Sequence, residues 1–409
     1  VNRLYGCRCG AEYSRRCRSM HKIIQEAKLL LPELIQFRRT LHQYPEIGFD
    51  LVKSKTEVIK RLESKNLSWE EFEGSIVVKL GNGGNSALLL RSELDALPMN
   101  EESGLPFSSK TPNRAHCCGH DMNAAILLGA LILLKKHNIK GPVVGLFQAA
   151  EEIGEGAKRL MDADFLNKFN IVSGISMHVN AKLSLGKLGY GKGKMFASNT
   201  SFDVVIHGKG SHGARPFEGK DPINIAVQIY NVLNSIVARE VNVFKHNIFS
   251  VTSINAGDAY NVIPETVIMK CSLRTYDEES RKYLENRFWE VLKGMESVFD
   301  VKIEYTIHSF VPSLVATPDF VDNLLDLAKK IIPLDQIDSQ PAIKYGSEDF
   351  AFIAKHLKQI ASMSIGAGPD KSTPYLYGQH NSKVLFNEEA ILYGCALQSW
   401  WAMNISEEM

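Results

Sequence analysis

PVVGLFQAAEE, residues 142–152, is the stretch that decides the fold. Its apolar run has the length of a buried strand, and it leads directly into two consecutive glutamates. SALLLRSELD (86–95) and IVSGISMH (171–178) also run from apolar residues into polar ones. Residues 122–137, between the strands at 86–95 and 142–150, are predicted to form a helix that is apolar nearly all round. Strands separated by helices predict an α/β domain with a mostly parallel sheet.

The pattern changes after about residue 195, where half-buried antiparallel strands are indicated by alternating apolar and polar residues. The predicted order is strand, helix, strand, strand, helix, strand, at 202–208, 221–237, 247–257, 265–276, 277–298 and 301–309. This order is typical of a ferredoxin-like α+β unit. We therefore predict an inserted domain at 196–311, with an outer domain assembled from 20–195 and 312–409.

Residues 1–19 differ from the rest of the chain, with five arginines, three cysteines and one acidic residue. Two interpretations stay open: a targeting presequence, or an upstream extension with Met20 as the true beginning. The predicted fold therefore begins at residue 20.

The net charge, the longest apolar segment and the cysteine count exclude some classes of function. A formal net charge of +1 gives no reason to expect nucleic acid or an anionic membrane as partner. The most apolar segment, 124–136, is well short of the roughly 20 residues that cross a bilayer. The odd count of seven cysteines does not indicate a secreted disulfide framework, so we expect free thiols and a cytoplasmic location.

HCCGHD, residues 116–121, concentrates possible metal ligands. Cys118 and His120 are two residues apart with Gly119 between them, so a thiolate and an imidazole could converge on one metal ion. The alternative is a pair of buried thiols beside ordinary histidines. Cys117 and Cys118 are adjacent, which disfavours an unstrained disulfide between them.

Polar residues at the predicted strand ends add to this cluster, because ligands gather at the carboxyl ends of strands in open α/β sheets. Of Glu151 and Glu152, one could ligate a metal while the other addresses a bound water; alternatively, they form a solvated acidic turn. His178 alone could equally be a satisfied core histidine. Glu93 and Asp95 share one face of a strand, and Asp95 could fix a ligand histidine's tautomer or simply end the strand.

The inserted region offers three candidates: His212 in a glycine-rich turn, Asn261 in NVIP, and Arg274 at a strand end. An arginine can bind a carboxylate in bidentate fashion, although each of these residues could also be an ordinary surface side chain. YGSEDF (345–350) and the His380–Asn381 pair add polar groups near the end of the chain.

Taken in order, these motifs resemble the co-catalytic metallo-amidohydrolases of the hippurate hydrolase and auxin (indole-acetyl) amino acid conjugate hydrolase type. That family is related to the aminoacylases and glutamate carboxypeptidases. The resemblance runs from about residue 32 to the C-terminus, through RRTLHQYPEIGF, LRSELDALP, AHCCGHD, AAEE, GSHGARPFEGKDP, NVIP, LRTYD and GSEDF.

The resemblance implies a site with two divalent metal ions, which could be Mn, Zn, Ni or Co, and hydrolysis of N-acyl amino acids. It implies a homodimer formed through the inserted lid domain. It assigns the general base to Glu151 and an active-site role, often in a partner subunit, to His212. The implied metal ligands are Cys118 (between the metals), His120, Glu152, His178 and His380. Asn261 and Arg274 fall on the substrate side, and the supporting residues are Asp95, His116 and Asp121.

Two positions depart from the family pattern: Glu93 stands where the family usually has Asp, and Asn123 where it usually has His. These departures bear on the residues around the metals and on fine substrate preference. Two other functions stay open. One is a dipeptidase or carboxypeptidase of the same architecture. The other is a non-catalytic binding protein, although such a protein has no need of Glu151.

Overall fold

The computed structural model describes residues 9–338, 346–369 and 376–407, which divide into two units. One unit contains residues 9–193, 316–338, 352–369 and 376–407, and the other contains 194–315 and 346–351. Within the described residues, no helix is long and apolar enough to cross a membrane.

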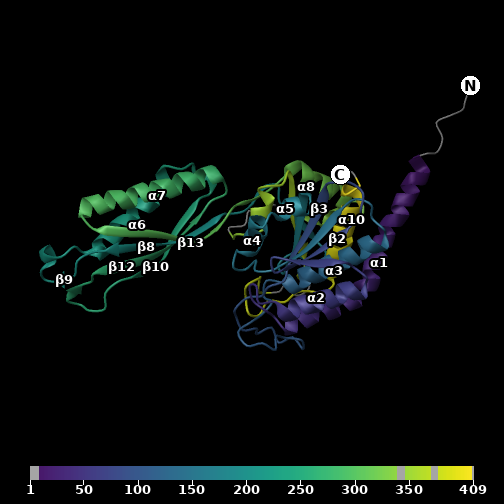
Figure 1. Ribbon diagram of the computed structural model, residues 1–409, viewed down its shortest axis with the longest axis horizontal. Helices are drawn as coiled ribbons and strands as arrows, with labels where there is room; N and C mark the ends of the chain where they lie inside the picture. Colours follow the sequence, from purple (N-terminus) through teal and green to yellow (C-terminus); the bar gives the residue numbers. More distant parts are fainter. Residues whose placement is uncertain (1–8, 339–345, 370–375, 408–409) are drawn as a thin grey trace, which may run out of the picture. The chain divides into compact units, whose positions relative to one another are not determined.

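An eight-stranded sheet forms the centre of the first unit, in the order β1-β2-β4-β3-β5-β16-β6-β15 (Figure 1). The central strands β4, β3, β5 and β16 are parallel, while β1, β2 and β6 pair antiparallel with their inner neighbours. The strands are β1 (Trp69–Phe72), β2 (Ser75–Leu80), β3 (Ala87–Glu93), β4 (Val143–Gln148), β5 (Ile171–Asn180), β6 (Leu188–Tyr190), β15 (Ile337–Asp338) and β16 (Gln359–Gly366). The predicted α/β class with a mostly parallel sheet is confirmed.

The helices of this unit are α1 (Cys9–Gln43), α2 (Val52–Ser64), α3 (His120–Lys136), α4 (Gly156–Asp162), α5 (Phe165–Lys168), α8 (Pro318–Ala328), α9 (Ala351–Ala354) and α10 (Ala390–Ile405). α1 begins at Cys9, ahead of residue 20, where the predicted fold begins. α3, α1 and α10 pack against one another. Gly129 makes this close approach possible: a Cβ there would lie 2.6 Å from Leu34 Cδ1 and 2.7 Å from Cys395 Sγ.

The second unit contains a four-stranded antiparallel sheet in the order β10-β12-β8-β13. Its strands and helices are β8 (Asn199–His207), α6 (Pro222–Arg239), β10 (Ile248–Asn255), β12 (Thr266–Arg274), α7 (Glu278–Phe299) and β13 (Lys302–Val311). This is the predicted strand and helix order, and with β8 beside both β12 and β13 it is the ferredoxin-like arrangement. Two short pairs, β9 (Ser211–His212) with β11 (Val262–Ile263) and β7 (Gly193–Phe196) with β14 (Leu314–Ala316), are the remaining strands of the described residues.

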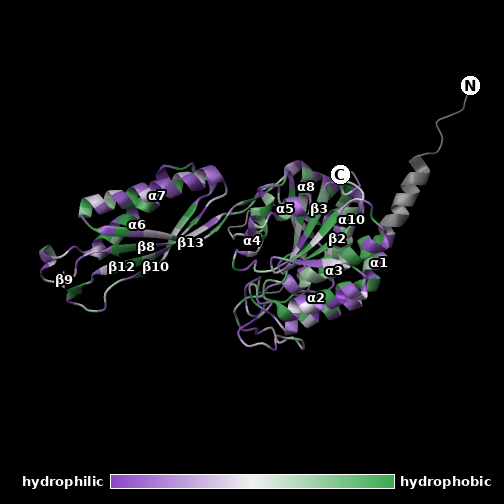
Figure 2. Ribbon diagram, viewed as in Figure 1, coloured by the Kyte–Doolittle hydropathy of each residue, from purple (hydrophilic) through white to green (hydrophobic). Residues whose placement is uncertain are grey.

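A separate hydrophobic core holds the second unit together. β8 turns Phe202, Val204 and Ile206 inward, and these side chains meet a buried stripe of each helix, represented by Ile229 and Phe288. The amphipathic character of α7 is visible as alternating purple and green in Figure 2. The second unit therefore has the core of an independent domain.

Candidate metal centre

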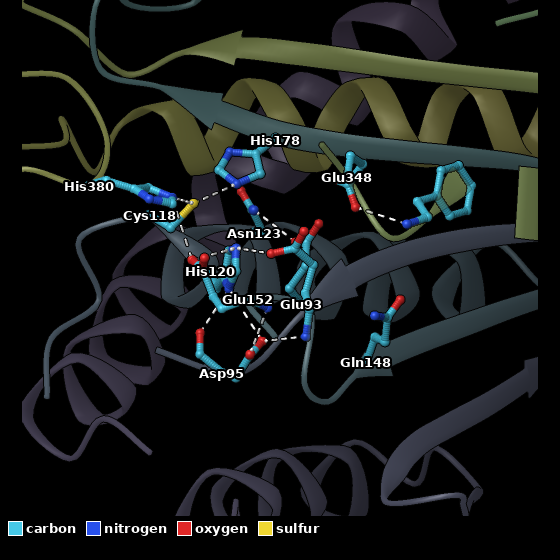
Figure 3. Close-up of polar contacts among 12 residues, drawn as sticks. Glu93, Asp95, Cys118, His120, Asn123, Gln148, Glu152, His178, Glu348 and His380 are labelled. Carbon is cyan, nitrogen blue, oxygen red and sulfur yellow. Dashed lines mark hydrogen bonds and ion pairs between the residues drawn. The ribbon is translucent and has the colours of Figure 1, made fainter. Parts of the chain in front are cut away.

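The N-terminus of α3 and the carboxyl ends of β3, β4 and β5 bring the predicted ligands together. Gly119 precedes α3 with φ 101°, and a Cβ there would lie 2.5 Å from Val179 Cγ2, so the turn requires glycine. This turn lets Cys118 and His120 face one centre. His178, near the end of β5, faces the same centre (Figure 3).

The distances between these side chains are compatible with ligation of shared metal ions. Cys118 Sγ lies 3.4 Å from His178 Nε2 and 3.3 Å from His380 Nε2. Glu152 Oε1 lies 3.8 Å from His120 Nε2 and 3.7 Å from His380 Nε2. Ligand atoms around one tetrahedral ion, each about 2.0–2.3 Å from it, stand roughly 3.3–3.8 Å apart. The five side chains therefore fit a metal centre.

Cys118 holds the middle position in this arrangement. One group of converging ligand atoms comprises Cys118, His120 and His178, and another comprises Cys118, Glu152 and His380. A thiolate common to two groups is suited to bridging two ions. A third group joins His120 to both Glu151 and Glu152, with Glu151 Oε2 3.8 Å from His120 Nε2.

Two histidines are held in the tautomer that metal binding needs. His120 Nδ1 lies 2.8 Å from the Asp95 carbonyl oxygen, and His178 Nδ1 lies 2.8 Å from the Val179 carbonyl oxygen. A carbonyl only accepts hydrogen bonds, so each Nδ1 carries the proton and donates it. In the neutral ring, each Nε2 then keeps its lone pair, which is the atom an imidazole ligand offers to a metal ion.

The electrostatics of the centre also favour cations. Within the described part of the chain, His120 Nε2 and Glu152 Oε1 are buried without a hydrogen-bond partner. Burial raises the pKa of the Cys118 thiol well above its ordinary value and also raises the pKa of the Glu152 carboxyl. Both groups must be ionised to ligate, so divalent cations would offset the penalty that burial imposes on their charges.

Asp95 organises the turn that carries the two glutamates. Its Oδ1 accepts from the Glu151 backbone N–H at 3.1 Å, and its Oδ2 accepts from the Glu152 N–H at 3.0 Å. Ala150, just before this turn, has φ 59°, an uncommon conformation for a residue with a side chain. The prediction that Asp95 fixes a histidine tautomer needs correction in one respect. The hydrogen bond to His120 is made by its backbone carbonyl, because the carboxylate is taken by the glutamate turn.

Asp121 and His116 belong to a buried network that connects the start of α3 with α1. Asp121 Oδ2 lies 2.5 Å from Arg38 Nε and 2.8 Å from His42 Nδ1, and His42 Nε2 lies 3.1 Å from Glu101 Oε1. Despite the cost of burial, Arg38 and His42 hold the pKa of Asp121 far below its usual range. His116 stacks on the His42 ring with centroids 6.3 Å apart. Sequence reasoning did not assign roles to Arg38 and His42, although both lie in the quoted RRTLHQYPEIGF motif.

The three predicted residues of the insert belong to the second unit. His212 pairs with Val262 across the β9–β11 ladder, and the Gly213 N–H donates to the Asn261 carbonyl at 2.7 Å. The Ala214 N–H donates to His212 Nδ1 at 3.1 Å, so a neutral His212 ring carries its proton on Nε2. Arg274 is the last residue of β12.

The remaining predicted residues lie near the end of the chain. Glu348 is buried and accepts from the Phe350 N–H at 3.0 Å, while Tyr345 lies outside the described residues. The His380 N–H donates to the Cys117 carbonyl at 2.9 Å, which ties His380 to the residue before Cys118. Asn381 Oδ1 accepts from the Lys383 N–H at 3.0 Å.

The sequence and the fold both match known proteins. The family described as Peptidase family M20/M25/M40 matches residues 89–401. An N-acetyl-L-cysteine deacetylase of Bacillus subtilis is 36% identical over 330 residues, 80% of this chain and 78% of that relative. A hippurate hydrolase of Campylobacter jejuni is 32% identical over 372 residues, 90% of this chain and 95% of that relative.

A solved structure has a similar fold. The YxeP protein of Bacillus subtilis, described as a dinuclear metal binding peptidase from the M20 family, superimposes with a TM-score of 0.79 at 26% identity. The match covers 93% of this chain and 99% of that one. The fold and the ligand cluster thus define a metal-dependent hydrolase of amide bonds. The chain belongs to Peptidase family M20/M25/M40, which confirms the resemblance.

Proposed function

We propose that this protein hydrolyses the amide bond of N-acyl amino acids, releasing a carboxylic acid and an amino acid. The observation that carries the proposal is the convergence of Cys118, His120, Glu152, His178 and His380 beside a further carboxylate, Glu151. The similarity to a deacetylase of N-acetyl-L-cysteine and to a hippurate hydrolase supports the substrate class, because N-acetylcysteine and hippurate are N-acyl amino acids.

Two divalent ions held by the five ligands would lower the pKa of a shared water and polarise the amide carbonyl. Glu151 is our candidate for the general base: it would take the proton of the attacking water and return it to the leaving amine. Its side chain is 13% exposed and one oxygen lies 3.8 Å from His120 Nε2, so it is at the centre yet open to a small molecule. Mn, Zn, Ni and Co each suit this mixed set of Cys, His and Glu ligands.

We also propose that residues of the second unit act on the substrate. With Nδ1 engaged by the Ala214 N–H, an exposed His212 presents an Nε2–H donor that could stabilise an oxyanion. Asn261 and Arg274 are our candidates for binding the substrate carboxylate. The resemblance to the family supports a homodimer formed through this unit, with His212 reaching a partner's site. The free thiols Cys117, Cys118, Cys271 and Cys395 support a reducing, cytoplasmic location.

A second candidate is peptide hydrolysis, which is favoured by a carboxypeptidase relative from Saccharolobus solfataricus, 29% identical over 95% of this chain. The deciding experiment returns Mn, Zn, Ni or Co to metal-free protein. It then compares acetyl-, benzoyl- and indole-acyl amino acids with dipeptides and longer peptides. We expect the highest kcat/KM for an N-acyl amino acid. A preference for peptides would establish the second candidate, and metal binding without hydrolysis of either class would establish a binding protein.

A further inference from the structure

Asn123 connects three elements of the metal centre through one buried side chain. It lies in the first turn of α3, three residues after His120, and is 1% exposed. Its Nδ2 donates to Glu93 Oε2 at 2.9 Å, at the end of β3. Its Oδ1 accepts from the Val179 N–H at 3.0 Å, on β5 directly after His178. Figure 3 shows Asn123 between Glu93 and His178.

The orientation of this amide is set by its partners. The Val179 N–H can only donate, so the Asn123 oxygen must face β5 and its NH₂ must face β3. The group on β3 must then be an acceptor. Glu93 meets this need as a carboxylate: although burial opposes its ionisation, the Arg91 guanidinium holds its pKa at about 2.

The second oxygen of the Glu93 carboxylate is also held in place. Arg91 Nη1 pairs with Glu93 Oε1, and Arg91 Nε donates to Gln148 Oε1 at 2.9 Å. Arg91, Glu93 and Gln148 are all fully buried. A continuous series of hydrogen bonds thus runs from β4 through β3 and α3 to the residue that follows His178.

This series connects the elements that carry His120 and His178. His120 is on the helix that carries Asn123, and His178 is on the strand whose next N–H binds Asn123. The 3.4 Å spacing of His178 Nε2 from Cys118 Sγ depends on how β5 sits against the start of α3. We propose that Asn123 is a positioning residue for His178, and that the Arg91–Glu93 ion pair orients Asn123. The inference rests on the metal centre of the proposed function.

Glu93 and Asn123 are also the two positions where the resemblance implies a departure from the usual family residues, Asp and His. The geometry explains how they belong together. Glu93 reaches one methylene further than an aspartate would, and Asn123 is shorter than a histidine, so the pair spans the gap between β3 and α3. A shorter acid at position 93 or a longer side chain at position 123 should each disturb the contact. Both changes together should restore it.

The test is a titration of metal-free protein with Co²⁺, whose visible spectrum reports both thiolate ligation and coordination number. We expect Asn123→Ala to bind one Co²⁺ equivalent at least about tenfold more weakly than wild type, as loss of a supporting contact typically does. The spectrum should change in the direction produced by His178→Ala. Ser92→Ala is the matched control, since Ser92 is buried on β3 next to Glu93 and its hydroxyl has no hydrogen-bond partner among the described residues.

A rescue pair separates positioning from a general loss of stability. Glu93→Asp and Asn123→His should each weaken the same Co²⁺ equivalent, and the double variant should recover to within about threefold of wild type. The inference is overturned if Asn123→Ala binds both equivalents with wild-type affinity and spectrum. It is equally overturned if the double variant binds Co²⁺ as weakly as the weaker-binding of the two single variants. Wild-type protein that binds two Co²⁺ but hydrolyses no N-acyl amino acid would contradict the proposed substrate and leave this inference standing.

Discussion

Replacing Asp95 by asparagine should loosen the Glu151–Glu152 turn. The aspartate accepts one backbone N–H on each carboxylate oxygen, at 3.1 and 3.0 Å, and is fully buried. Asparagine has one acceptor oxygen, so its NH₂ group must face the other N–H. One hydrogen bond to a charged acceptor is lost, and we expect the free energy of unfolding of the metal-free protein to fall by about 2 kcal/mol.

The effect on catalysis should be larger than the effect on stability. Ala150 already has φ 59°, so the turn is held in a conformation that its surroundings enforce. With one of its two anchors gone, the Glu151 carboxylate should shift. A displacement of about 1 Å can lower a rate by roughly 100-fold. We therefore expect kcat of the metal-loaded variant to fall by about that factor.

Urea titration, monitored by tryptophan fluorescence, measures the change in the free energy of unfolding. Trp69, Trp400 and Trp401 report on the first unit, with Trp289 alone in the second. Asp50→Asn is the control, because the Asp50 side chain is 71% exposed. The reasoning is refuted if Asp95→Asn matches the control in both unfolding free energy and kcat.

Two further predictions concern stability. Gly129→Ala should destabilise the first unit by about 1–3 kcal/mol in thermal or urea unfolding, because the new methyl meets Leu34 and Cys395 at 2.6–2.7 Å; a stabilised variant would contradict the tight packing. Although burial opposes ionisation, hydrogen bonds from His42 hold the pKa of Glu101 at about 2, below its ordinary value. Its stabilisation is therefore complete above the ordinary pKa and is lost as the pH falls through the folded one. Glu101→Gln should thus be less stable than wild type by about 2 kcal/mol at pH 6, with a gap that narrows toward pH 3; a gap independent of pH would be evidence against the ion pair.

The sequence predicted the elements whose side-chain pattern has a clear period. The six elements of the insert were predicted because one face of each strand and helix packs on a single core, so burial follows the period directly. The strands that precede Glu151 and His178 were predicted for a related reason: central parallel strands are apolar along their length. Short strands such as β1 and β15 were missed, because four or two residues carry no period.

The predicted ligands meet because parallel strands end at one edge of the sheet, a rule that sequence alone can apply. The supporting contacts could not be predicted in this way. Asp95 was placed near a histidine, but no sequence pattern shows that its carboxylate binds two backbone N–H groups of another strand's loop. The roles of Arg38 and His42 likewise depend on how α1 packs on α3. Such contacts are set by tertiary packing and not by local pattern.

The central claim is that Glu151 moves the proton at a centre of two metal ions. Glu151→Gln tests it most directly, because the five ligands and the backbone bond from Glu151 to Asp95 are unchanged. Metal content and turnover of an N-acyl amino acid are measured on the same preparation. We predict two ions per chain and a kcat lower by about 10²–10⁴-fold. Wild-type turnover with both ions bound would contradict the account.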